Sequence, residues 1–214
     1  MKNSSKYIIA SSVACIIVCI GEFAAIFVFG SYYPGYSQLK DTMSLLGSSI
    51  SPVSAEISTW WALAGILLMF FGTGFRKAFL EKGRYSKLAS WLIILYGFGE
   101  GIGSGIFKSD RIANELTTSA FIHDAFGGIG VASILLFPFI MQKVFSKNEK
   151  PVFYRISQIV FVTGLITILL FLFRLLPDEN NFFSIYKGLW QRLFMLNTYF
   201  YLTFIAILMI KKQK

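Results

Sequence analysis

Six ionisable side chains lie inside long apolar stretches of this sequence, where such groups are costly and usually face the interior of a helix bundle. They are Glu22, Glu100, His123, Asp124, Arg174 and Arg192. The acids and the arginines can pair with one another and hold helices together, or they can bind a polar ligand from several helices. The histidine adds a third possibility, because its neutral ring can serve as a general base.

The same residues form no recognisable metal or cofactor motif. Glu22, Glu100, His123 and Asp41 could contribute metal ligands, but the chain has one histidine and neither an HxxxH nor an HExxH pattern. A phosphate-binding loop, a GxSxG nucleophile motif and a haem-type histidine pair are also missing from the sequence. We therefore expect no metal and no cofactor.

The composition is that of a membrane protein. Of the 214 residues, 55% are hydrophobic and 14% are charged. A soluble domain of this size needs more polar surface, whereas a helix of about 20 apolar residues crosses a bilayer. The net charge of +9 comes from basic residues in short loops between apolar runs, which indicates membrane topology and no nucleic-acid partner. The expected partner is the lipid bilayer.

The apolar runs predict an all-α, polytopic membrane protein with a bundle of six transmembrane helices in one domain, residues 1–214. Each run must be helical, because lipid offers backbone polar groups no other partner. The expected spans are residues 7–30, 56–75, 88–107, 119–141, 156–176 and 188–210.

The distribution of lysine and arginine predicts the orientation. The two termini and the loops around residues 76–87 and 143–155 hold fourteen of the 20 basic residues, and the opposite loops hold four. Positive charge gathers on the cytoplasmic side, so we expect a multi-pass protein of the plasma (inner) membrane with both termini in the cytoplasm. Trp60, Trp61 and Trp190 would then lie near the outer boundary, as interfacial aromatic residues do.

The ionisable residues inside the spans all fall in the outer halves. At 1.5 Å per residue, Glu22 and Glu100 lie ~12 and ~10 Å below the outer ends of their spans, and His123 and Arg192 lie ~6 Å below them. The inner halves carry no charge. This asymmetry predicts a polar cavity that opens to the outer side above a dry plug.

Glycines at positions 97, 99, 101, 103 and 105 alternate around Glu100. Positions 97, 101 and 105 would share one face of a helix and positions 99 and 103 another, and faces of small residues let helices approach closely. So many glycines also weaken a helix, so a local break beside Glu100 is an alternative to plain packing.

The longest connection, residues 31–55, is predicted to fold back on the outer mouth of the bundle. Ser37 can cap a short helix, and Leu39, Met43 and Leu46 would then share one apolar face. That face needs an apolar partner, which favours an ordered lid over a mobile loop.

The segment YPGYSQLKDTMSLLGSSISP, at residues 33–52, resembles the signature of the family called domain of unknown function 998, small prokaryotic membrane proteins. FIHDAFGG in the fourth span and KGLWQR at the start of the sixth are similar to further parts of that pattern. The resemblance covers nearly the whole chain and implies a six-span bundle without a settled activity. The site positions it implies are Pro34, Gly35, Tyr36, Ser37, Asp41, Ser44, Gly47, Pro52, His123, Gln191 and Arg192.

Three functions fit these residues. In the first, an outward-facing polar cavity binds or transports a small polar or amphiphilic ligand, with an anionic group favoured because arginine grips carboxylates and phosphates. Its binding residues would be Arg192, Arg174, Glu22, Glu100, Asp124, Gln191, Tyr36, Ser37 and Asp41. The two halves of the chain do not match, which argues against an alternating-access transporter built from repeats.

In the second function, the protein is an intramembrane enzyme that acts on a lipid headgroup at the outer leaflet. His123 would be the general base, with Asp41 or Glu100 as its partner acid. In the third, it is a structural or assembly subunit whose charges only pair. Arg192 is then expected to face Glu22, Glu100 or Asp124, and the sequence alone does not decide whether there is catalysis.

The orientation can be tested with a cysteine placed at Gly83, in the loop around residues 76–87. We expect an impermeant thiol reagent added to intact cells to leave this cysteine unlabelled, and permeabilised cells to allow labelling, because the basic loop lies in the cytoplasm. Labelling of intact cells would reverse the predicted orientation.

Overall fold

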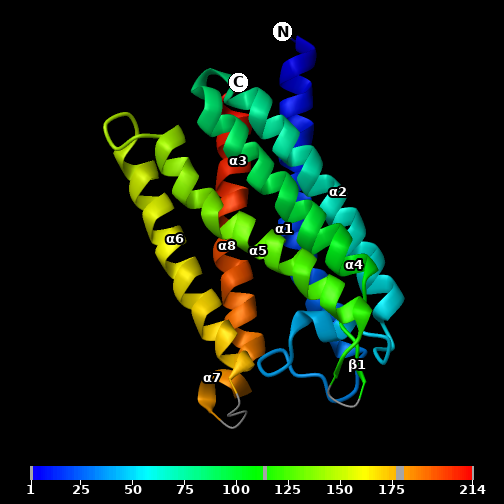
Figure 1. Ribbon diagram of the computed structural model, residues 1–214. Coiled ribbons are helices and arrows are strands. Elements are labelled where there is room, and N and C mark those ends of the chain that lie inside the picture. Colours follow the sequence, from blue (N-terminus) through cyan, green and yellow to red (C-terminus); the bar gives the residue numbers. More distant parts are fainter. Residues whose placement is uncertain (1, 113–114, 177–180, 214) are drawn as a thin grey trace.

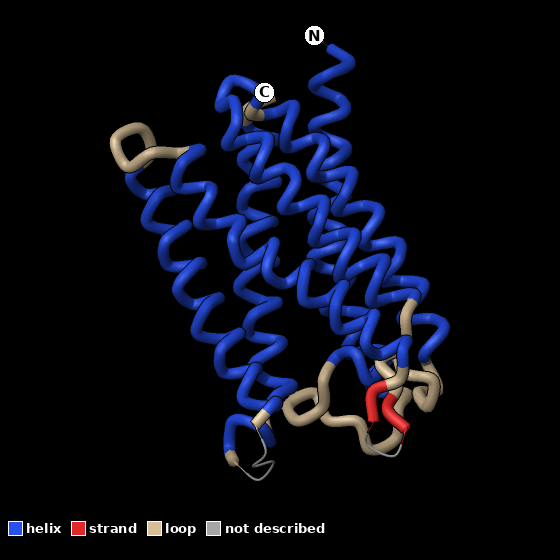
Figure 2. Tube along the Cα trace, in the orientation of Figure 1, coloured by secondary structure: helices blue, strands red, loops and turns tan. Residues whose placement is uncertain are grey.

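The computed structural model describes residues 2–112, 115–176 and 181–213, and its fold is an all-helical bundle (Figures 1 and 2). The main helices are α1 (Lys2–Ser31), α2 (Ser54–Ala78), α3 (Gly83–Tyr96), α5 (Thr118–Val144), α6 (Pro151–Leu172) and α8 (Lys187–Lys211). Short helical segments are η1 (Met43–Gly47), η2 (Leu80–Lys82), η3 (Gly97–Gly103), α4 (Ser104–Ile106), η4 (Phe173–Leu175) and α7 (Phe182–Ile185). The strands β1 (Arg111–Ile112) and β2 (Glu115–Leu116) form one antiparallel pair.

Within the described residues, five helical segments are long and apolar enough to cross a membrane, which makes this a multi-pass membrane protein. They are Asn3–Ser31, Ser54–Ala78, Thr118–Val144, Pro151–Leu175 and Lys187–Lys211. The third predicted span, residues 88–107, is instead built from α3, η3 and α4 in succession. Because η3 is a π-helix, no single long α-helix forms there, and a sixth crossing stays a prediction.

The two ends of the bundle differ. Both termini, the connection between α2 and α3 and the connection between α5 and α6 lie at one end, which we call the terminal end (Figure 1). At that end Lys82 pairs with Glu149 at 3.0 Å, and Lys212 pairs with Glu81. The opposite end, which we call the cap end, carries β1, β2 and residues 32–53, which we call the cap. The basic segments predicted to be cytoplasmic therefore share one end.

The predicted glycine faces around Glu100 are confirmed. Positions 97, 101 and 105 face α2, where a Cβ added at Gly105 would lie 3.2 Å from the carbonyl oxygen of Ser58, and Gly97 and Gly101 abut Gly65. Positions 99 and 103 face α5, against Phe126 and Gly130. The predicted break is present too, because the helix widens into the π-turn η3 at these glycines. Backbones of three elements thus meet without intervening side chains.

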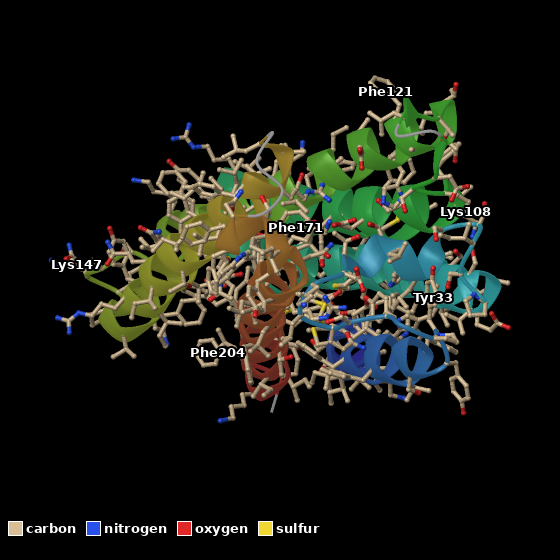
Figure 3. All side chains as sticks on the ribbon, turned by 90° about the horizontal axis from the view of Figure 1, so that it is seen from below. Tyr33, Lys108, Phe121, Lys147, Phe171 and Phe204 are labelled. Atoms are coloured by element: carbon tan, nitrogen blue, oxygen red, sulfur yellow. The ribbon has the colours of Figure 1, made fainter. Side chains whose placement is uncertain are left out.

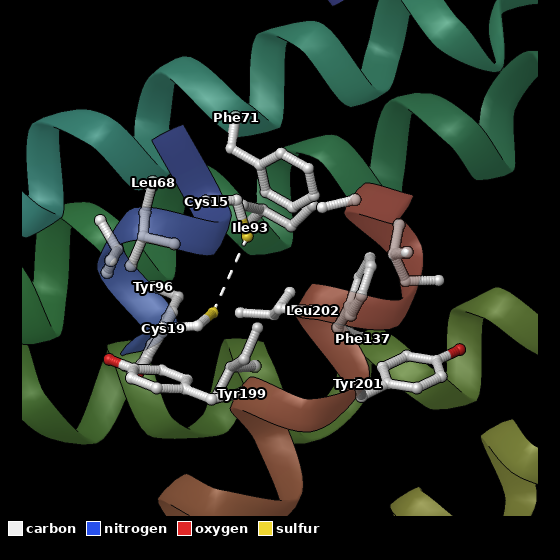
Figure 4. Packing of buried hydrophobic residues seen from close by; sticks show 14 of the residues in the cluster. Cys15, Cys19, Leu68, Phe71, Ile93, Tyr96, Phe137, Tyr199, Tyr201 and Leu202 are labelled. Atoms are coloured by element: carbon white, nitrogen blue, oxygen red, sulfur yellow. Dashed lines mark hydrogen bonds between the residues drawn. The ribbon is translucent and has the colours of Figure 1, made fainter. Parts of the chain in front are cut away.

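The half of the bundle toward the terminal end has a core rich in aromatic side chains, and the predicted dry plug stays a prediction. Phe71, Phe75, Phe79 and Phe137 are almost fully buried, and Phe75 packs against Phe137 with ring centres 5.8 Å apart. Figure 4 shows part of this cluster between α1, α2, α3 and α8. Cys15 and Cys19 belong to it as free thiols, with sulfurs 3.9 Å apart.

The close contact between Gly65 and η3 predicts that a glycine-to-alanine substitution destabilises the protein at Gly65 but not at Gly128. In Gly65→Ala, the new methyl group would lie 2.9 Å from the amide nitrogen of Ile102 and 3.0 Å from the Cα of Gly101, so the backbones must separate. We expect a loss of about 1–3 kcal/mol, typical of overpacking, seen as a lower thermal midpoint in detergent.

Gly128→Ala in α5 is the matched control. A Cβ at Gly128 would meet no atom within 4 Å, so alanine should gain helix stability of up to about 1 kcal/mol. Equal thermal midpoints for the two alanine variants would contradict the proposed role of the glycine contact.

Candidate functional site

A cavity of about 620 Å³ lies in the cap half of the bundle. Its polar lining includes Glu22, Ser44, Glu100, Ser104, His123, Asp124, Arg174 and Gln191, and two tyrosines, Tyr96 and Tyr199, also line it. Its apolar lining includes Leu165, Ile168, Leu169 and Leu172, which follow one another on one face of α6, and side chains of α2, α5 and α8. The cavity wall therefore combines charged groups with hydrocarbon.

The cavity exists because α5 and α6 pack tightly only at the terminal end. There Phe139 and Phe161 are 5.5 Å apart between ring centres, and a Cβ on Gly164 would lie 3.2 Å from Leu135. Toward the cap end the two helices diverge (Figure 1), and seen from that end α6 stands at the edge of the bundle beside α8 (Figure 3). In this region α5 offers Gly127 and Gly128 rather than large side chains, so the space stays unfilled.

Glu22 lines the cavity from α1 and is 2% exposed. Its carboxylate accepts hydrogen bonds from the indole nitrogens of Trp60 at 2.7 Å and Trp61 at 2.9 Å. Both indole N–H groups are therefore turned to Glu22, because a buried carboxylate needs hydrogen-bond donors. The depth of the two tryptophans relative to the membrane boundary stays a prediction.

Glu100 reaches the cavity from η3 and lies against two glycines of α5. A Cβ on Gly127 would be 3.4 Å from its carboxylate oxygen, and one on Gly130 would be 3.1 Å from its Cγ. Asp124 lines the same cavity one turn earlier on α5 and is exposed. Arg174 enters from η4, with its guanidinium carbon 4.1 Å from the centre of the Phe171 ring.

His123 is held in one orientation by backbone carbonyls. Its Nδ1 lies 2.9 Å from the carbonyl oxygen of Phe107 and 3.1 Å from that of Ser104, and both partners can only accept. The proton therefore sits on Nδ1, and Nε2 carries a lone pair. The side chain is 8% exposed and contributes to the cavity wall.

Arg192 does not line the cavity and is not paired with an acid among the described residues. Its guanidinium donates to Gln38 Oε1 at 2.8 Å, to the Tyr36 hydroxyl at 2.5 Å, and to the carbonyls of Asp41 and Gly188 at 2.9 Å. The expected pairing with Glu22, Glu100 or Asp124 is thus wrong, because neutral oxygens of the cap and of α8 occupy its donors.

The cap is an ordered lid, fastened at several points. The amide of Met43 donates to Gln191 Oε1 at 2.8 Å, and the carbonyl of Leu39 accepts from the amide of Leu189 at 2.8 Å. Leu46 is fully buried and Met43 packs on the core, as predicted, but the Leu39 side chain is 50% exposed.

The short helix of the cap begins at Met43 rather than after Ser37. The amide of Ser37 donates to the Asp41 carboxylate at 2.8 Å, which closes a turn where the helix was expected. Tyr36, Ser37 and Asp41 therefore build the lid and its anchor, and they lie outside the cavity lining.

A family model described as "Protein of unknown function (DUF998)" matches residues 16–208. The chain belongs to the DUF998 family. No curated protein and no solved structure matches it. In this DUF998 protein the expected site residues fall into two groups. Those that line the cavity are Glu22, Ser44, Glu100, His123, Asp124, Arg174 and Gln191. Those that form the cap or hold it are Pro34, Gly35, Tyr36, Ser37, Asp41, Gly47, Pro52 and Arg192.

Sequence reasoning missed the residues that hold the charged groups. The sequence places Trp60 and Trp61 at the interface and gives no sign of their bonds to Glu22. Nor does it point to Gln38, which accepts from Arg192 and donates through its amide to the carbonyl of Ile26 at 2.9 Å. A tryptophan pair opposite a buried glutamate is a signal only when the register of two helices is known. The described part of the chain holds no cluster of three or more histidine, cysteine or acidic residues that could bind a metal.

Loss of Arg192 in this DUF998 protein should release the cap. Arg192→Ala removes a charged donor from four buried or half-buried oxygens, and we expect a loss of roughly 3 kcal/mol and faster proteolysis within residues 32–53. Arg192→Lys should be intermediate, because lysine keeps the charge but lacks the planar fork.

Arg155→Ala is the matched control, since Arg155 is an exposed arginine of α6. Removal of Glu22, Glu100 or Asp124 should not rescue Arg192→Ala, because these acids are not its partners. Rescue by one of them would restore the ion-pair interpretation.

Proposed function

We propose that this DUF998 protein binds an amphiphilic molecule of the bilayer in the cavity between α5 and α6. The observation that carries the proposal is the cavity itself, whose volume of about 620 Å³ falls in the usual range for ligand sites. Its polar side offers partners for a head group, and the α6 face of leucine and isoleucine offers apolar contacts for a hydrocarbon chain.

Access from the bilayer is supported by the way the cap is attached. Arg192, Gln191 and Leu189 of α8 bind the cap, and Asp110 accepts two hydrogen bonds from Ser49, at 2.5 and 2.8 Å. Among the described residues, no side-chain hydrogen bond or salt bridge joins α5 to α6 where the two helices diverge. Leu169 and Leu172 on that side are 51% and 44% exposed, as expected for side chains that meet lipid.

This proposal includes the sixth crossing by α3, η3 and α4, and the placement of the terminal end in the cytoplasm of a plasma membrane. The head group would then lie in the outer half of the bilayer. Arg192 is engaged by the cap, so of the two expected arginines only Arg174 contributes to the cavity lining. An anionic ligand therefore has less support than the sequence suggested.

A catalytic role is a second candidate, and the orientation of His123 favours it. Nδ1 is committed to two carbonyls, so Nε2 is the basic atom, as in a general base. Glu100 shares the cavity lining and fits the expected partner acid, whereas Asp41 is bound to Ser37 in the cap. An enzyme of this kind would act on the head group of the bound amphiphile.

The test fills the cavity without disturbing the fold. Gly128 lines the cavity and has open space around its Cβ, so Gly128→Leu should fold normally and occupy part of the ligand's volume. We expect native mass spectrometry of protein released from nanodiscs to detect a bound amphiphile on the unaltered chain. The bound fraction should fall at least tenfold in Gly128→Leu.

Ala125→Leu is the matched control, because Ala125 is exposed on the same helix and does not line the cavity. This variant should keep the amphiphile. Equal retention by Gly128→Leu and the unaltered chain would overturn the proposal, and conversion of an added amphiphile to a product of different mass would support the enzyme instead.

A further inference from the structure

Most of the charged groups of the cavity wall are carboxylates. Glu22, Glu100 and Asp124 contribute carboxylates, which accept only when ionised. The carboxylate of Glu22 already receives two indole N–H groups, yet these donors are neutral and leave its charge uncompensated. A ligand that complements these carboxylates must therefore bring donors.

His123 adds a second, independent acceptor. The ring is more than nine-tenths buried, and its Nδ1–H is directed away to the carbonyls of Ser104 and Phe107. Over the described residues, Nε2 has no hydrogen-bond partner, and the ring belongs to the cavity wall. This lone pair at the cavity wall is available to an N–H or O–H group of the cavity's occupant.

The ionised side chains of the lining carry a net negative charge, which also favours a ligand with donor groups. In the described part of the chain, three carboxylates and one guanidinium, that of Arg174, line the cavity. Arg192, the other cation inside the bundle, is turned to the cap and held by four neutral oxygens. Uncompensated carboxylates in a low-dielectric site favour a cation among them.

On the basis of the proposed function, we infer that the bound amphiphile carries an ammonium group as its polar end. Glu100 and Asp124 are its charged partners and Nε2 of His123 accepts one of its N–H groups, and the aromatic residues Trp61 and Tyr96 belong to the same lining. The hydrocarbon chain lies along the leucine face of α6. A free alkylamine and the ethanolamine head of a phospholipid both offer this chemistry.

The experiment compares amphiphiles that share one chain and differ in the head. Dodecylamine, dodecyltrimethylammonium, dodecanol and dodecyl phosphate, each brominated at the chain end, are added to phosphatidylcholine nanodiscs. Quenching of Trp60 and Trp61 is measured in protein that carries Trp91→Phe and Trp190→Phe. The same titration in Gly128→Leu gives the background from partitioning into lipid.

We expect dodecylamine to bind at least tenfold more tightly than dodecanol or dodecyl phosphate. Dodecyltrimethylammonium should fall between them, because it keeps the charge but has no N–H donor. Glu100→Gln and Asp124→Asn should each reduce the preference for the amine over the alcohol to less than threefold, with thermal midpoints unchanged. Lysophosphatidylethanolamine as a further probe distinguishes a phospholipid source, since it should then displace dodecylamine.

Equal affinities for the amine, the alcohol and the phosphate, or tighter binding of the phosphate, would overturn the ammonium inference and leave the amphiphile site in place. If every probe quenched Gly128→Leu as strongly as the protein that keeps Gly128, the cavity would not be the binding site. The failure of the ammonium inference and the failure of the proposed function are therefore distinguishable.

Discussion

The contact between the glycine-rich π-turn and its neighbours sets the geometry on which the cavity depends. Gly97 and Gly101 bring η3 directly against Gly65 of α2, with no side chains between the backbones. This close packing leaves Glu100 on the opposite side of the turn, facing Gly127 and Gly130 of α5. A larger residue at any of these seams would push α5 or α2 outward, and π-turns are frequent where a functional side chain must be displaced from a regular helix.

The half of the bundle toward the terminal end is packed for stability, and the half toward the cap end contains the charged groups and the cavity. Toward the terminal end, Phe75, Phe79, Phe137 and Phe145 interlock, and this packing fixes α5 against its neighbours. Toward the cap end, no comparable aromatic layer joins the described parts of α5 and α6, and Gly127 begins the region where they separate. The dense half therefore allows the other half to contain charged groups and space without loss of the fold.

Much of the fold follows from the sequence because its signals are local. Apolar runs indicate the helices, and glycine spacing at positions 97–105 indicates both packing faces. The partner of Arg192 could not be predicted in this way, because Gln38 and Tyr36 lie about 150 residues away in the chain and are uncharged. Sequence reasoning matched opposite charges by depth, whereas the fold satisfied the guanidinium with neutral oxygens of the cap.

The binding of Arg192 to neutral oxygens, rather than to an acid, changes the electrostatics of the whole site. Had Arg192 met Glu22, Glu100 or Asp124, two arginines would have faced the three interior acids, and a structural network would have neutralised most of the charge. Instead the cap holds Arg192 apart, Glu22 rests on two indoles, and Glu100 and Asp124 face a space that is also bounded by hydrocarbon. Charge left uncompensated beside an apolar wall is a cost that a structural bundle has no reason to carry. An amphiphile with a cationic head removes that cost at one end while its chain fills the gap between α5 and α6 at the other.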